Sequence, residues 1–134
     1  MNTELSQWFR AGVQERMQKV ADAEESITVA TDRIMADPTP ETLAATTMVA
    51  DELLAAANAG LAWLRDHPCP ITHVGATLQE AFHQFQVASE TLINMGTGQL
   101  PMTAASGGTA AQAIALARRS LYDAAFGFAA EIAK

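Results

Sequence analysis

The side chains with the most reactive chemistry gather in one short segment. Residues 67–73 (His-Pro-Cys-Pro-Ile-Thr-His) hold the only cysteine and two of the three histidines. Imidazole nitrogen and thiolate sulfur are zinc ligands, so His67, Cys69 and His73 form a candidate metal site. The same groups could support nucleophilic catalysis if the thiolate lay beside an orienting base. Both hypotheses depend on how the flanking chain positions these groups.

The spacing of the histidines argues against a shared metal ion. Glu80 and His83 copy the Glu-x-x-His spacing of di-iron helical bundles. Within one helix, however, His73 and His83 stand about 15 Å apart along the axis and about 80° apart around it, so they cannot bind one ion together. A di-iron bundle also requires a second such motif, and the sequence contains only this one. The two prolines favour a stiff turn between helices, with Cys69 as a small buried apolar group.

Two other patterns bear on enzymatic chemistry. The acidic pairs Glu24-Glu25 and Asp51-Glu52 consist of sequence neighbours, which point to different faces of a helix and do not form an acid–base dyad. The Ser and Gly residues before Thr109 resemble an anion-binding helix start. No Gly-Lys-Thr/Ser motif and no nearby lysine accompany them. The sequence therefore predicts no catalytic residue, no metal ligand and no cofactor, which favours a non-enzymatic protein.

Apolar residues recur in steps of three and four along four segments, which is typical of helices that bury one face. No segment shows the alternating pattern of a strand. The expected helices cover about residues 3–36, 40–66, 72–95 and 109–133. Their short links predict an all-α fold, an antiparallel four-helix bundle built of two helical hairpins. A length of 134 residues suits a single domain, residues 1–134.

Local signals mark the expected helix ends. Thr39 followed by Pro40 is typical of a capped helix start. Thr72 is a candidate cap for the third helix, and Gly96 favours a left-handed termination of the same helix. The Gly, Thr and Ser residues of segment 97–108 predict the longest irregular connection.

Charge and composition exclude several classes of partner. The chain has 8 Lys and Arg against 15 Asp and Glu, a net charge of -7, which disfavours surfaces that neutralise nucleic-acid phosphates or anionic lipids. The longest uncharged run, residues 91–117, is interrupted by Gly and Pro and does not predict a membrane span. The single cysteine cannot form an internal disulfide, and the first residues lack the features of a signal peptide. We therefore expect a cytoplasmic protein that binds neither nucleic acid nor membranes.

The second expected helix is apolar around more of its circumference than one bundle requires. Between residues 43 and 64 only Asp51 and Glu52 are charged. Two apolar seams run along this helix about 100° apart. The seam with Leu54 and Leu61 suits the core, and we expect the other to meet a second copy of the chain. With two aromatic residues of the last helix, the predicted interface comprises Val49, Leu53, Ala56, Gly60, Trp63, Tyr122 and Phe126.

One short segment resembles other proteins. Trp63 to Pro70 (WLRDHPCP) is similar to a segment of uncharacterised small Ala-rich helical proteins of actinobacteria, a resemblance that implies a source rather than an activity. The favoured function is a non-enzymatic adaptor or accessory subunit, a homodimer that acts through self-association and protein–protein interaction. The alternative is a bundle that binds a small molecule or a metal near residues 67–73 or 97–108.

Overall fold

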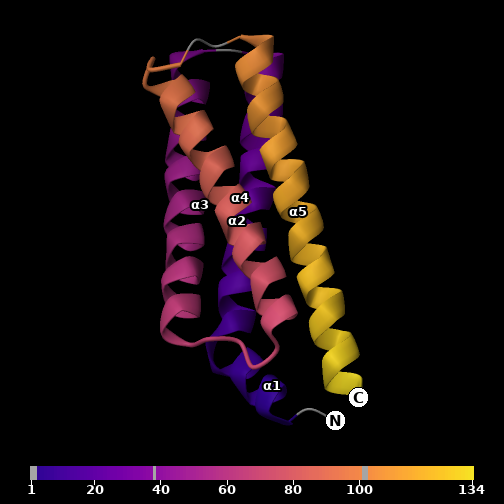
Figure 1. Ribbon diagram of the computed structural model, residues 1–134. Helices are drawn as coiled ribbons and strands as arrows, with labels where there is room; N and C mark the ends of the chain where they lie inside the picture. Colours follow the sequence, from indigo (N-terminus) through magenta and orange to yellow (C-terminus); the bar gives the residue numbers. More distant parts are fainter. Residues whose placement is uncertain (1–2, 38, 101–102) are drawn as a thin grey trace.

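The chain folds into long helices that lie side by side (Figure 1). The computed structural model describes residues 3–37, 39–100 and 103–134. The helices are α1 (Thr3–Trp8), the π-helical turn η1 (Phe9–Val13), α2 (Gln14–Ala36), α3 (Pro40–Asp66), α4 (Thr72–Gly96) and α5 (Ala104–Ala133). Because α1, η1 and α2 are contiguous, the described residues form four helical rods and no strand. The predicted all-α, four-helix bundle is confirmed.

Each rod packs mainly against its neighbours in the sequence. The third helix, α3, contacts both α2 and α4, and α4 contacts both α3 and α5. Since α3 and α4 also pack on each other, the two predicted hairpins share one hydrophobic core. The backbones of α2 and α5 approach less closely, and a salt bridge from Arg118 of α5 to Glu24 of α2 spans between them. The contacts of α1 with α5 also link the first rod to the last.

The π-helical turn η1 keeps the first rod in register with the core. Val13, Val20 and Ile27 are buried at seven-residue steps, whereas Leu5 precedes Val13 by eight residues and is buried as well. A π-helical turn places one more residue in a helical turn, so it takes up the additional residue and keeps Leu5 on the inward face. The sequence pattern predicted a continuous α-helix here and did not predict this turn.

The starts of α3 and α4 differ in how they are capped. At α3, the Oγ1 of Thr39 accepts a hydrogen bond from the Thr42 N–H at 3.2 Å, which confirms the predicted cap. At α4, the cap position is Ile71, which makes no side-chain hydrogen bond. Its carbonyl accepts the first helical bond from the Gly75 N–H at 3.1 Å, so Thr72 already lies inside the helix. The predicted cap at Thr72 is therefore wrong.

The last helix begins at Ala104, and the start predicted near Thr109 is wrong. Thr103 is the cap residue, and its Oγ1 accepts a hydrogen bond from the Ser106 N–H at 3.2 Å. Glycine disfavours a helix interior by about 1 kcal/mol relative to alanine, which is why the sequence predicted a loop through residues 107–108. A capping hydrogen bond contributes about 1 kcal/mol and offsets part of that cost.

The irregular connection between α4 and α5 is shorter than the predicted segment 97–108, of which residues 101–102 lie outside the described residues. The glycine with a left-handed backbone is Gly98, with a φ of 81°, rather than Gly96 as predicted. Gly96 serves a different purpose, because a Cβ at that position would collide with Oγ1 of Thr47 on α3. It allows the end of α4 to approach α3 closely.

The core combines a few large rings with many small residues. Phe82 and Phe85 of α4 and Phe128 of α5 are almost completely buried. The other residues that α5 buries are Ala110, Ala113, Ala117 and Ala124. Such small side chains let α5 lie close against α4. Within the described residues, none of the helices combines the length and apolarity that crossing a membrane requires.

Candidate interaction surface

An aromatic cluster packs around His67, which begins the segment 67–73 that holds the candidate metal ligands and the cysteine. The rings of Trp63 and His67 stack with centroids 4.4 Å apart and an interplanar angle of 13°. The backbone carbonyl of His67 accepts a hydrogen bond from Nε1 of Trp8 at 2.8 Å. The Trp8 ring also lies 5.4 Å from that of Trp63 and 5.6 Å from that of Phe128. These contacts join α1, α3 and α5 and give His67 a structural role.

The other reactive groups of this segment lie in separate environments. Cys69 is half-buried against Gly75, and burial raises the pKa of its thiol, which disfavours a nucleophilic thiolate. His73 is exposed, with Nε2 3.8 Å from Oε1 of Glu131 on α5. Within residues 3–37, 39–100 and 103–134, no three His, Cys, Asp or Glu side chains are grouped to hold a metal ion. The geometry of this segment therefore favours neither a metal centre nor a thiol nucleophile.

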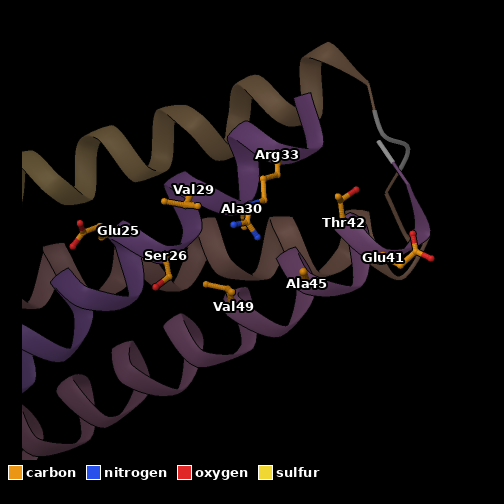
Figure 2. Close-up of a pocket in the computed structure, with 9 residues that line it drawn as sticks. All are labelled: Glu25, Ser26, Val29, Ala30, Arg33, Glu41, Thr42, Ala45 and Val49. Atoms are coloured by element: carbon orange, nitrogen blue, oxygen red, sulfur yellow. The ribbon is translucent and has the colours of Figure 1, made fainter. Parts of the chain in front are cut away.

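Grooves on the surface give little support to a small-molecule site. A groove of about 600 Å³ runs between α2 and α3, with Val29 and Ala30 on one side and Val49 on the other (Figure 2). Only Ala30 among its lining residues is buried. Small-molecule sites enclose most of their ligand, which this open groove does not do. A second groove, of about 530 Å³ between α3 and α4, is lined by Asn58, Leu61, Ala62, Leu64, Arg65, Gln79 and Gln86.

The predicted interface residues of α3 do not form one exposed surface. Leu53 and Gly60 are buried in the core and cannot contact a partner while the bundle is intact. Trp63 belongs to the aromatic cluster described above. Val49 is half-buried and lines the groove between α2 and α3, and Ala56 is half-buried. The structure thus separates this seam from Tyr122 and Phe126 of α5.

The predicted interface residues of α3 are covered because α3 packs between α2 and α4. Its fully buried stripe takes residues from both apolar seams and comprises Thr46, Ala50, Leu53, Ala57 and Gly60. The remaining residues of each seam lie on the flanks of this stripe and are partly covered, since α2 packs on α3 as α4 does. The apolar surplus of α3 is therefore largely used within one copy of the chain.

Three of the exposed large apolar side chains, Leu116, Tyr122 and Phe126, lie on α5. Tyr122 and Phe126 are 63% and 73% exposed, one helical turn apart. They lie on the side of α5 opposite the buried Ala117 and Ala124. Three exposed alanines, Ala115, Ala129 and Ala130, lie on the same side of the helix. We call this surface the outer face of α5; it comprises Ala115, Leu116, Arg119, Tyr122, Asp123, Phe126, Ala129 and Ala130.

The charged groups on the outer face of α5 have no partner in the described part of the chain. The neighbouring Arg118 pairs with Glu24 of α2, but Arg119 and Asp123 make no ion pair or hydrogen bond to any described residue. The interface predicted from the sequence includes neither of them. Arg119 lies three residues before Tyr122, and Asp123 lies three residues before Phe126, spacings that set each charge beside a ring on the surface of a helix.

The outer face of α5 exposes two aromatic residues, Tyr122 and Phe126, and aromatic residues are enriched where proteins meet. The eight-residue resemblance to actinobacterial proteins stays a prediction. No family model, no curated protein and no solved structure matches the chain.

Proposed function

We propose that the protein is a non-enzymatic helical-bundle protein, an adaptor or accessory subunit, which self-associates as a dimer and acts by binding another protein. The exposure of Tyr122 and Phe126 on the outer face of α5 supports this proposal. Covering apolar surface contributes about 25 cal/mol per Å² removed from water, so two adjacent rings offer a partner a favourable site. A cytoplasmic location fits the single thiol, Cys69, which has no disulfide partner within the chain.

Sedimentation equilibrium at micromolar concentrations tests the self-association. We expect the wild-type mass to rise with concentration from 14.2 kDa toward twice that value. The double variant Tyr122→Ser/Phe126→Ser should remain a monomer, because it removes both exposed rings from α5. The double variant Val29→Ser/Met48→Ser is the matched control, since these side chains are 50% and 64% exposed on α2 and α3. It should dimerise like the wild type.

Two results would contradict the proposal in different ways. A wild-type mass that stays at that of one chain at every concentration excludes self-association. Dimers that form equally well with and without Tyr122 and Phe126 exclude the outer face of α5 as the contact surface. Circular dichroism of each variant checks that the helices remain intact, as expected for substitutions at exposed positions.

A further inference from the structure

Resting on the self-association proposed above, we propose that the outer face of α5 binds α5 of a second copy in antiparallel orientation, about a two-fold axis level with Leu121. The exposed rings of Tyr122 and Phe126 lie one turn apart on this face, and Tyr122 is one position from the level of the axis. Three residues of this face, Ala115, Ala129 and Ala130, have small side chains that allow two helices to approach closely.

The charge of the whole molecule favours α5 as the surface where two copies meet. The chain carries a net charge of -7, so two copies repel each other. That charge is spread unevenly: α3 has four acidic residues and one basic residue, and α4 has two acidic residues and no Lys or Arg. The sequence of α5 contains two basic and two acidic residues and is neutral. Contact through α5 therefore brings the least like charge together.

The two unpartnered charges of the outer face fix the orientation and the register. In a two-fold dimer each contact occurs twice, with the roles of the copies exchanged. An antiparallel pair centred on position 121 sets Arg119 level with Asp123 of the partner subunit, and Asp123 level with Arg119 of the partner subunit. A parallel pair in register sets Arg119 level with Arg119 of the partner subunit, which is repulsive. Only the antiparallel pair brings opposite charges together at both positions.

The same axis brings exposed apolar side chains together. Phe126 and Leu116 each lie five positions from residue 121, so each Phe126 stands level with Leu116 of the partner subunit. Leu116 is 46% exposed and Phe126 is 73% exposed. In the dimer, Phe126 of each copy covers Leu116 of the partner subunit and is covered by it. Because one axis accounts for both the charged and the apolar side chains, the occupant that best fits this face is a second copy of the chain.

Charge reversal at positions 119 and 123 tests the arrangement by sedimentation equilibrium at low salt. Arg119→Asp sets Asp against Asp at two places in the dimer, and Asp123→Arg sets Arg against Arg. Each single variant should weaken dimerisation by about tenfold or more, and the double variant Arg119→Asp/Asp123→Arg should restore it. An equimolar mixture of the two single variants should form mixed dimers, seen by native mass spectrometry as a species containing one chain of each kind.

Arg33→Asp is the matched control, because it changes the net charge equally at an exposed position on α2. It should weaken dimerisation less than Arg119→Asp does. Dimers that respond equally to Arg33→Asp and Arg119→Asp, or a mixture of single variants that forms no mixed dimer, overturn the antiparallel pairing and leave self-association standing. Masses that grow beyond a dimer also overturn it, since a two-fold contact closes. A wild-type chain that is always a monomer overturns both proposals.

Discussion

Replacing Gly60 by alanine tests a close contact between α3 and α4. A Cβ at position 60 would lie 2.6 Å from Cζ of Phe82, whose ring is fully buried and has little room to move. At Gly108 of α5 a Cβ would meet nothing within 4 Å, so the same substitution there is a matched control. Both positions lie inside helices, where alanine is favoured over glycine by about 1 kcal/mol.

The expected free energies of unfolding follow from these two contacts. Gly108→Ala should raise the free energy of unfolding by about 1 kcal/mol, because it gains helix propensity without a clash. Gly60→Ala gains the same propensity but overpacks the core, which costs about 1–3 kcal/mol. Urea unfolding followed by far-ultraviolet circular dichroism should therefore find Gly60→Ala less stable than Gly108→Ala by about 1–3 kcal/mol.

A second measurement separates the clash with Phe82 from other effects. If the ring is what opposes the new methyl group, Phe82→Leu should cost less in the Gly60→Ala background than in the wild type. The expected coupling free energy is about 1 kcal/mol or more. Two variants of equal stability, or a Phe82→Leu effect that is the same in both backgrounds, would refute the close approach of α3 and α4 at Gly60.

Three further predictions concern the cap, the aromatic cluster and the thiol. Thr103→Ala removes the acceptor of the Ser106 N–H, so urea unfolding should show a loss of about 1 kcal/mol. Trp8→Phe removes the hydrogen bond to the His67 carbonyl and should cost about 1 kcal/mol by the same measurement. Burial raises the pKa of Cys69, so its alkylation by iodoacetamide should reach half-maximal rate at a higher pH in the folded chain than in urea. The contribution of the Cys69 thiol to the free energy of unfolding is fully present below the pKa that this thiol has in the unfolded chain. It is lost as the pH rises through the higher pKa of the folded chain, because the thiol of the unfolded chain ionises at a lower pH.

The fold was predictable where one apolar stripe is flanked by polar residues. On α4, the three- and four-residue steps of the apolar pattern run through Val74, Leu78, Phe82 and Phe85, and all four are buried. Polar side chains such as Gln79 occupy the other faces of this helix, so only one orientation buries the apolar set. The bounds of α3 were equally predictable, because Thr39 provides a cap and the helix ends before a proline-rich link.

The sequence was less informative at two places where a hydrogen bond or the packing of the core outweighs the conformational preference of single residues. The start of α5 was misplaced because glycine propensity was counted without the capping hydrogen bond of Thr103. The turn η1 was missed because the eight-residue interval between Leu5 and Val13 also fits two four-residue steps through Phe9. In both cases the preferred conformation depends on bonds and packing that a pattern of residue types does not contain.

The predicted interface residues of α3 are mostly covered, whereas those of α5 are exposed, and this difference has a physical reason. On α3 the apolar residues surround the helix, and a helix of that kind can be covered from two sides by its own chain, as α2 and α4 do. Counting apolar faces therefore could not tell whether Leu53 meets a neighbour in the same chain or in another copy. On α5 the buried residues recur along one face of the helix from Ala110 to Phe128, and all of them except Phe128 are alanines. Tyr122 and Phe126 lie off that face on the opposite side of the helix, where they are 63% and 73% exposed, and it is this surface that we propose a second copy covers.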